Sequence, residues 1–467
     1  MDTMTATKVN TAKGRQLLGF SFNNASTNTA FYFINLYFLV YCTEIYGFSA
    51  LLVGSIMMGT RLFDAVTDPF IGLLIDTTDT RFGRFRPWIL GGAILSGAMS
   101  VLMFSGIKTG SSIGDLILVI ILYSVWVLGY TAQTACTKSV QNILTCVPKQ
   151  RSWINALGTL FSVLVYLFAM AGALPIIKSL GGIADSGAWR TGGMIFAAVQ
   201  LAFAVLVVLG IGKKDVAENY IKLQVKEKPR FEDFIKIFKS NRALQMLIIA
   251  ASTNKITQTM QSGLTVLLFV YVARNQALQS TVPIFSVPFM IIATFVLIKL
   301  IDKYGRKETF TFSSWGGFLF GLAAIALVPI NPSNLIWLVI VVSINLILTA
   351  GAGEINIISM IADSADYEYY THNRFVPSMI GATFSFIDKL VSSFGTLIIG
   401  VILTGVGFVS ITATPASPVM FWSVLAMYFG FPALGHLCSI ISMKFYPLDK
   451  KTHERMLTEL AEREKRA

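Results

Sequence analysis

Charged residues are scarce in this chain of 467 residues. Asp, Glu, Lys and Arg together make up 13% of it, about half of the ~25% that is usual in soluble domains. Cysteine and histidine are scarcer still, with four and three copies, and neither type shows a C-x-x-C or metal-ligand spacing. The composition therefore excludes a soluble enzyme, a disulfide scaffold, a disordered chain and a structural metal site.

The sequence also lacks the signatures of nucleotide binding and of covalent catalysis. No G-x-x-x-x-G-K-[ST] motif occurs, so the chain has no phosphate-binding loop of that type. No nucleophile with a neighbouring base and no cluster of metal ligands can be recognised. We therefore expect no enzymatic activity and no cofactor.

Long apolar runs are what the chain has in abundance. A helix that crosses a bilayer needs ~20 mostly apolar residues, and about twelve runs of that kind occur. They span residues 20–42, 50–76, 87–107, 116–147, 153–177, 191–212, 244–272, 281–301, 308–329, 334–361, 376–405 and 418–443. This pattern predicts an all-α integral membrane protein with twelve transmembrane helices in two six-helix bundles. The expected parts are an N-terminal bundle (1–212), a linker (213–243), a C-terminal bundle (244–445) and a tail (446–467), the tail being a short helix with solvated charges.

The basic residues predict the orientation in the membrane. Most of the 37 Lys and Arg residues fall in the N-terminal tail, the linker, the C-terminal tail and the loops on that same side. The positive-inside rule then places both termini and the linker in the cytoplasm, in a bacterial plasma membrane. The net charge of +12 follows from this topology, so the expected partners are the lipid bilayer and a small molecule rather than nucleic acid. We expect the chain to work as a monomer.

Two cytoplasmic loops share a pattern. The loop after the second span begins Asp79-Thr-Arg-Phe-Gly83-Arg84, and the loop after the eighth begins Asp302-Lys-Tyr-Gly305-Arg306. Each has Gly for a tight turn and cations that can cap the preceding helix or pair with carboxylates of its neighbours. We interpret both as gate latches, and the alternative is two positive-inside loops that happen to contain Gly.

Ionisable residues inside a membrane are functional candidates because each costs ~2.5–3.5 kcal/mol on insertion scales. Eight qualify: Arg61, Asp64, Asp68, Lys138, Lys255, Glu354, Asp388 and Lys389. Asp64 and Asp68 lie one helical turn apart and repel, so at least one must be balanced by Arg61, a Lys, a proton or a metal cation. That chemistry is what a coupling site requires, whereas a static Arg61–Asp64 pair is the alternative.

Uncharged polar residues form stripes on three of the predicted spans. The stripes are Asn24, Thr27 and Asn28; Thr131, Thr134, Lys138 and Gln141; and Asn254, Gln258 and Gln261. Each stripe could hold helices together by hydrogen bonds, but together with paired charges they favour a water-accessible polar cavity. Phe31, Tyr32, Phe33 and Tyr37 could stack on a sugar ring or pack against lipid.

The segment Arg61-Leu-Phe-Asp64-Ala-Val-Thr-Asp68-Pro, with the loop that follows it, closely resembles a signature of the glycoside–pentoside–hexuronide:cation symporters. This is the melibiose-permease family of the major facilitator superfamily. Ile361-Ala-Asp363-Ser-Ala-Asp366-Tyr, Lys389 and Phe445-Tyr-Pro-Leu448 agree with it as well. The resemblance implies the major facilitator fold, alternating access, and uptake of a sugar or glycoside with Na⁺, Li⁺ or H⁺. It makes Asp64 and Asp68 cation-coordinating residues with Lys389 and Arg61 near them, and it places Asp363 and Asp366 in the gate.

Several positions depart from melibiose permease. That protein has an acidic sugar-binding residue where this chain has Asn28, preceded by a lysine where this chain has Thr27. It also has an aspartate at the position of Thr134, a tryptophan at that of Lys138 and a sugar-binding arginine near Thr159. Losing an acid and gaining Lys138 would suit an acidic sugar such as a hexuronide. Alternatively, Lys138 pairs with Asp64 or Asp68, and the substrate is a neutral glycoside or pentoside.

Two further questions stay open. Na⁺ needs several oxygen ligands, here Asp64 and Asp68 with hydroxyls such as that of Thr131, whereas H⁺ needs a single titratable carboxylate. A lysine near two aspartates favours H⁺ over Na⁺. A sensor that binds sugar without moving it is the remaining alternative, although the linker and the tail lack a recognisable output domain.

Overall fold

The computed structural model describes residues 11–78, 80–145, 148–216, 231–349, 352–374 and 377–466, and every regular element in these ranges is a helix. The chain divides into two compact units, Met1–Phe48 with Leu62–Lys226 and Ser49–Arg61 with Glu227–Ala467. The division near residue 226 falls inside the expected linker. The start of α3 groups with the second unit, because there the backbone N–H of Leu51 donates to Thr404 Oγ1 at 3.0 Å.

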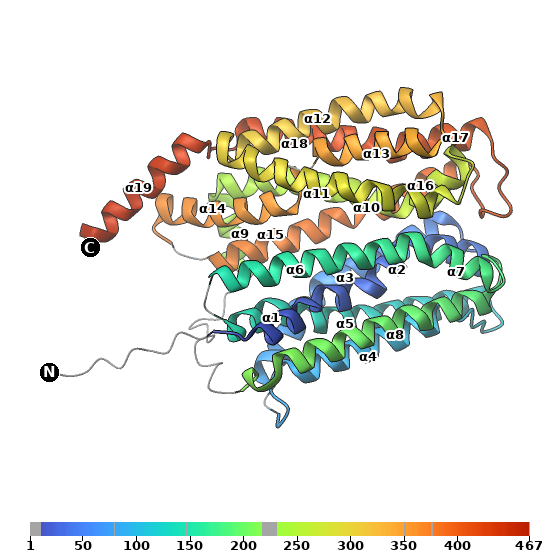
Figure 1. Ribbon diagram of the computed structural model, residues 1–467, viewed down its shortest axis with the longest axis horizontal. Helices are drawn as coiled ribbons and strands as arrows, with labels where there is room; N and C mark the ends of the chain where they lie inside the picture. Colours follow the sequence, from blue (N-terminus) through green and yellow to red (C-terminus); the bar gives the residue numbers. More distant parts are fainter. Residues whose placement is uncertain are drawn as a thin grey trace. The chain divides into compact units, whose positions relative to one another are not determined.

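The first unit contains α1 to α8 (Figure 1). Their bounds are α1 Gly14–Ser21, α2 Asn23–Tyr41, α3 Ala50–Thr77, α4 Arg86–Met103, α5 Ser112–Leu144, α6 Pro148–Leu167, α7 Ala173–Ser179 and α8 Ser186–Ile211. Helix α4 packs against α5 and α8, and α2 packs against α6 and α8. Small residues allow this close packing: a Cβ on Gly92 of α4 would lie 2.6 Å from the Gly129 carbonyl oxygen of α5.

Aromatic side chains fill the core of the first unit. Phe33, Tyr37, Phe104 and Trp189 are each at most 1% exposed, and the rings of Phe33 and Phe104 lie 4.7 Å apart. The Tyr37 hydroxyl donates to the carbonyl of Ala169 at 3.0 Å. The sequence reading that Phe33 and Tyr37 face a sugar or lipid is therefore wrong, since both rings are enclosed by neighbouring helices.

The second unit is built around α10. Its helices are α9 Phe231–Ser240, α10 Arg242–Leu267, α11 Leu278–Tyr304, α12 Arg306–Leu327, α13 Leu335–Thr349, α14 Glu354–His372, α15 Pro377–Ser392, α16 Phe394–Gly405, α17 Pro418–Leu425, α18 Phe431–Phe445 and α19 Lys450–Arg466. Helix α10 packs against α15, α16 and α18, and α12 packs against α13 and α18.

The expected linker and tail both contribute to the core of the second unit. Ile237 of α9 is buried there, together with Met456 and Leu460 of α19. Figure 1 shows α19 leaving the end of this unit that carries α9 and α14. The tail is helical as expected, but one face of it is packed because its apolar residues recur at a spacing of four.

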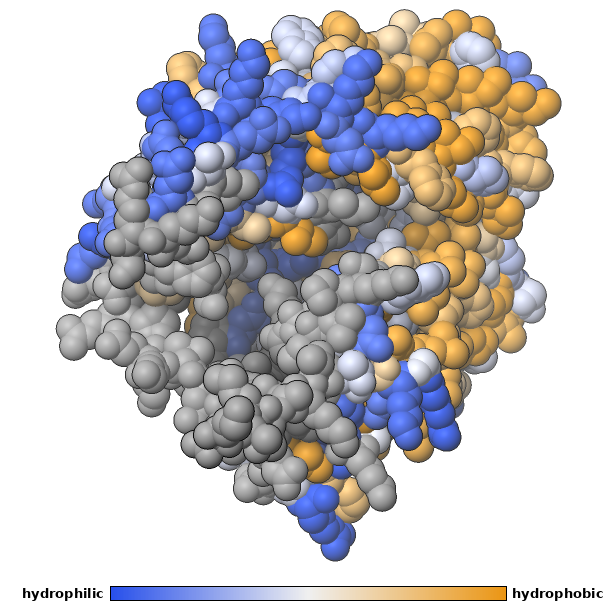
Figure 2. Space-filling model, turned by 60° about the vertical axis from the view of Figure 1, so that its left-hand side comes forward, coloured by the Kyte–Doolittle hydropathy of each residue, from blue (hydrophilic) through white to orange (hydrophobic). Residues whose placement is uncertain are grey.

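Nine segments of the described chain are long and apolar enough to cross a membrane. The predicted spans 20–42 and 244–272 form helices α2 and α10, and 334–361 forms α13 and part of α14; these are outside the nine. Helices α2 and α10 carry the polar stripes, and α13 is short. Figure 2 shows a face where hydrophobic side chains cover one flank and hydrophilic ones gather apart from them, as expected for a membrane protein.

Neighbouring glycines on α4 give a test of the helix packing. Gly92→Ala should lower stability by about 1–3 kcal/mol, because its methyl group would meet the backbone of α5. Gly91→Ala is the matched control, since nothing lies within 4 Å of the added methyl and the gain in helix propensity is the same. Thermal unfolding of the purified variants measures both, and equal melting temperatures would contradict the packing.

Candidate functional site

The site in the first unit is centred on Asp64. The hydroxyl of Thr131, on α5, donates to Asp64 Oδ1 on α3 at 2.6 Å. Asp64 is 4% exposed and Thr131 is 1% exposed. A buried carboxylate needs such a donor because unpaired burial of a charge is costly. The structure thus brings together two of the residues that the sequence assigned to the coupling site.

For the other predicted coupling residues, we describe the helix on which each lies and its burial. Arg61 and Asp68 lie on α3, three residues before and four after Asp64, and both are half-buried. Lys389 is half-buried on α15 of the second unit. Lys138 lies on α5 and Glu354 on α14, but their side chains are outside the described part of the structure.

The polar stripe of α2 faces α6 within the first unit. Asn28 donates to Ser162 Oγ at 2.9 Å, and the Tyr32 hydroxyl lies 3.0 Å from the same oxygen. Asn24 packs against Gly158. Ser162 was not singled out in the sequence, although Asn155, Thr159 and Ser162 recur at helical spacing along α6.

Two of the predicted substrate-binding hydroxyls bond to their own helices. Thr27 Oγ1 donates to the carbonyl of Asn23 at 3.1 Å, and Thr134 Oγ1 donates to that of Tyr130 at 3.2 Å. Such bonds satisfy a hydroxyl without a partner helix. These hydroxyls therefore have no need of a substrate to satisfy them.

Stacked rings lie beside the Asn28 cluster. The ring of Tyr130 on α5 stacks on Phe31 of α2 and on Trp126, both at 5.3 Å between centroids. Tyr32 meets Tyr166 edge to face at 5.2 Å. The unit thus combines an amide, hydroxyls and flat aromatic faces, which are the groups that bind sugar rings.

A separate set of buried polar residues in the first unit is structural. Ser26 donates to Gln133 Oε1 at 3.1 Å, and Ser96 Oγ accepts from Gln133 Nε2 at 3.1 Å and from Gln200 Nε2 at 2.7 Å. These four residues are at most 1% exposed. They hold α2, α4, α5 and α8 together by interhelical hydrogen bonds, as the alternative interpretation of such residues expected.

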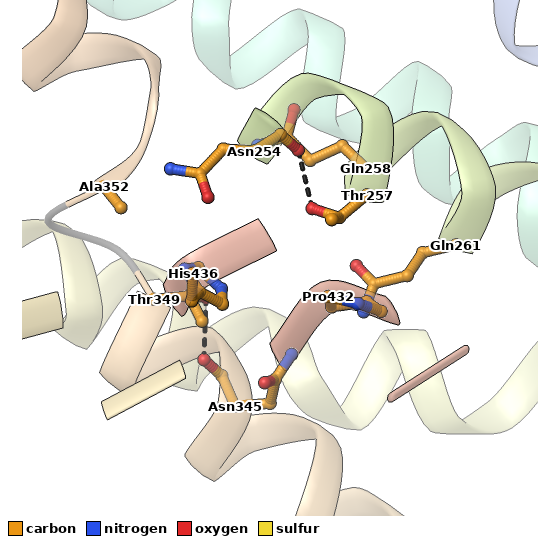
Figure 3. Close-up of a pocket in the computed structure, with 9 residues that line it drawn as sticks. All are labelled: Asn254, Thr257, Gln258, Gln261, Asn345, Thr349, Ala352, Pro432 and His436. Carbon is orange, nitrogen blue, oxygen red and sulfur yellow. Dashed lines mark hydrogen bonds between the residues drawn. The ribbon is translucent and has the colours of Figure 1, made fainter. Parts of the chain in front are cut away.

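The second unit contains a polar pocket between α10, α13 and α18 (Figure 3). Its lining comprises Asn254, Thr257, Gln258, Gln261, Asn345, Thr349, Ala352, Pro432 and His436. Most of these lining residues are polar, and the pocket is open at its mouth. The stripe on α10 predicted part of it, but Asn345, Thr349 and His436 come from helices where the sequence gave no signal.

The first latch loop is held by Asp215. The backbone N–H groups of Arg84, Phe85 and Arg86 donate to its carboxylate at 3.1, 3.0 and 2.9 Å. Gly83 has φ of +98°, and a Cβ there would clash with Asp215, so only glycine fits. Arg84 Nε donates to the carbonyl of Thr78 at the end of α3, as the predicted cap requires, whereas Asp79 lies outside the described residues.

Asp215 was missed in the sequence because it stands in the predicted linker beside Lys213 and Lys214. Its carboxylate occupies the N-terminal end of α4, where unpaired N–H groups and the helix dipole favour an anion. It is 1% exposed. The residue that holds the first loop thus comes from the start of the linker, just after α8.

The second latch loop is held by different groups. Gly305 again has positive φ, +96°, but the carbonyl of Asp302 accepts from Lys450 Nζ of the tail helix at 2.7 Å. The cation at this helix end therefore comes from α19 rather than from the loop, whereas the cation of the loop makes the expected pair with a carboxylate of a neighbouring helix. Arg306 pairs with Asp363 of α14.

His453 of the tail joins the same cluster. Its Nε2 lies 3.3 Å from Asp363 Oδ1, and this interaction raises the pKa of His453 above its usual value. Burial and the neighbouring Asp363 raise the pKa of Asp366. Neither Lys450 nor His453 was singled out in the sequence, because nothing local places the tail against this loop.

Solved structures of known function share this fold. A bacterial homolog of the human lysosomal transporter Spinster matches with a TM-score of 0.61 at 12% identity, covering 96% of this chain and 98% of that one. The nucleoside transporter NupG matches with a TM-score of 0.60 at 12% identity, covering 93% and 99%. The chain therefore has the all-α major facilitator fold and is a multi-pass membrane protein.

The chain belongs to the MFS/sugar transport protein family, which matches residues 19–450. The uncharacterised symporter YnaJ of Bacillus subtilis is 26% identical over 96% of this chain and 95% of that protein. The isoprimeverose transporter of Lactiplantibacillus pentosus is 24% identical over 95% and 90%. The glucuronide carrier protein homolog of Escherichia coli is 24% identical over 97% and 96%. The expected family and fold are confirmed, and the family is one of transporters rather than enzymes.

The Asp215 bonds can be tested by proteolysis. Asp215→Asn should speed tryptic cleavage at Arg81 and Arg84 about 10-fold, since hydrogen bonds to a charged acceptor are worth roughly 1.5–3 kcal/mol. Asp185→Asn is the control, because Asp185 caps α8 in a similar way. Unchanged cleavage of the Asp215 variant would show that its carboxylate does not hold the loop.

The pKa of His453 predicts a pH dependence for the tail. Because this pKa is raised, the protonated ring stabilises tail packing below about pH 6.5, and the contribution is lost as pH rises through the folded-state value. Hydrogen exchange of α19 should therefore speed up several-fold between about pH 6 and 8 beyond the intrinsic change. The pKa of Asp366 is also raised, from an ordinary value of about 3.9.

His453→Gln should remove this additional pH dependence. His372→Gln is the control, since His372 pairs with Glu368 at 3.3 Å on α14. If hydrogen exchange of α19 in the wild type shows only the intrinsic change across this pH range, the assigned role of His453 is contradicted.

Proposed function

We propose that the chain is a cation-coupled symporter that imports a sugar or glycoside by alternating access across a bacterial plasma membrane, with both termini cytoplasmic. The observation that carries the proposal is the buried Asp64 with its hydroxyl partner Thr131. A membrane-embedded carboxylate is a binding site for a proton or a metal cation. Relatives described as a symporter, an isoprimeverose transporter and a glucuronide carrier homolog support it.

The coupling ion we propose is H⁺. A proton needs one carboxylate that can be charged in one state and neutral in another, and the buried Asp64 meets that need. Na⁺ would need further oxygen ligands around Asp64, with Asp68 and the Thr131 hydroxyl as the nearest in the sequence pattern. Accumulation driven by a pH gradient without Na⁺ supports the first assignment, and a strict Na⁺ requirement supports the second.

An acidic sugar such as a hexuronide is the second candidate substrate. Lys138 lies on α5 seven residues after Thr131, which places both on one helical face. A lysine there could pair with a substrate carboxylate, and the glucuronide carrier homolog is in accord with this. A neutral glycoside or pentoside is the alternative, in which Lys138 belongs to the coupling network.

Replacing Asp64 tests the proposed function. Asp64→Asn should abolish accumulation of the sugar against its gradient while exchange of sugar across the membrane continues, because the amide cannot be charged. Thr131→Val should weaken accumulation about 10-fold, since it removes a bond to a charged group worth roughly 1.5–3 kcal/mol. Uptake by proteoliposomes with an imposed ion gradient measures both effects.

Thr60→Val is the matched control on α3. Thr60 is also buried, and its hydroxyl donates to the carbonyl of Met57 in its own helix. We expect it to accumulate sugar like the wild type. Full accumulation by Asp64→Asn would overturn the coupling assignment.

A further inference from the structure

Asn254 has an unused hydrogen-bond donor in the pocket of the second unit. Its Oδ1 accepts from Ser439 Oγ at 3.4 Å, whereas its Nδ2 is buried without a partner among the described residues. The residue is 4% exposed, and Figure 3 shows its amide directed away from α10 into the space between the helices. An amide N–H₂ left unpaired at this depth costs about 1–3 kcal/mol unless a ligand or water pairs with it.

His436 presents a second unused group to the same pocket. Its Nδ1 is also buried without a partner in the described chain. Its Cδ2–Nε2 edge lies against Gly317, where an added Cβ would clash with it. Gln261 is held as well: its Nε2 donates to the carbonyl of Tyr428 at 3.0 Å, and its carbonyl oxygen points toward the pocket (Figure 3).

We infer that this pocket binds an uncharged, hydroxyl-rich ring, such as one glycosyl unit of the transported sugar. Asn254 would donate to a ring hydroxyl, and His436 would exchange a hydrogen bond with it, since a hydroxyl both donates and accepts. The described residues of the lining include no Lys, Arg, Asp or Glu, so a carboxylate or ammonium group would find no counter-charge among them. The inference rests on the proposed function and specifies which part of the substrate the second unit recognises.

Binding to the purified full-length chain tests the inference with three probes: isoprimeverose, methyl β-D-glucoside and methyl β-D-glucuronide. Thermal stabilisation and titration calorimetry give the Kd of each. Asn254→Leu should weaken whichever probe binds the wild type about 10-fold, because a buried hydrogen bond to the ring is lost. Wild-type affinity in this variant means that the pocket holds only water, and it overturns the inference.

A pair of threonines on α10 provides a matched control, because valine keeps the shape of the threonine side chain. Thr257 and Thr259 each donate to a carbonyl of their own helix, at 2.7 Å and 2.9 Å, but only Thr257 lines the pocket. Thr257→Val should weaken binding several-fold, and Thr259→Val should not. Equal effects of the two variants would count against the pocket.

A lysine introduced at the mouth of the pocket tests whether the ligand is uncharged. Gln258 is exposed there, so Gln258→Lys should fold like the wild type. We expect it to leave the affinity for methyl β-D-glucuronide unchanged or weaker. Tighter binding would show that the pocket takes the carboxylate, and it would overturn the uncharged class.

Failure of the inference differs from failure of the proposed function. If the wild type binds or accumulates a probe and the pocket variants bind it as tightly as the wild type does, only the pocket assignment is wrong. If the wild type neither binds nor accumulates any of the three, the proposed function fails and the inference falls with it.

Discussion

The cost of placing polar groups in an apolar surrounding governs this structure. The bilayer offers no water to pair with a buried hydroxyl, amide or carboxylate, so the protein must supply the partners itself. In the first unit this requirement pairs Asp64 with Thr131 and joins Ser26, Ser96, Gln133 and Gln200 into one network. The Asp64–Thr131 pair and this network differ in the role that we assign to them. The hydrogen bonds of the network join uncharged side chains to one another, whereas Asp64 is the ionisable residue that we propose as the coupling site.

The same requirement explains why the two halves of the chain differ in detail. Both latch loops turn at a glycine with positive φ, which follows from their shared sequence pattern. Their anchors are unrelated: Asp215 accepts three backbone N–H groups in the first loop, and Lys450 donates to a backbone carbonyl in the second. One anchor is an anion at a helix N-terminus and the other a cation at a helix C-terminus, each matching the helix dipole.

The tail has a structural role through these contacts. Met456 and Leu460 pack into the core of the second unit, and Lys450 and His453 reach the loop and Asp363. The tail is thus connected to a latch by a group that titrates near neutral pH. In the pocket of the same unit, by contrast, Asn254 and His436 leave buried atoms unpaired. This difference is what separates a structural contact from a candidate binding surface.

The sequence alone determined the membrane class, the family and the position of the carboxylate that we propose for coupling. Apolar runs, polar stripes and the signature around Asp64 are local patterns, and spacing along one helix is enough to read them. Tertiary structure decided everything that depends on a partner far along the chain. Asp215 lies about 130 residues after the loop that it holds, and His436 of the last span lines the same pocket as Asn254. Phe33 and Tyr37 became core residues for the same reason: neighbouring helices, rather than their own spacing, decide whether a ring faces lipid, ligand or another ring.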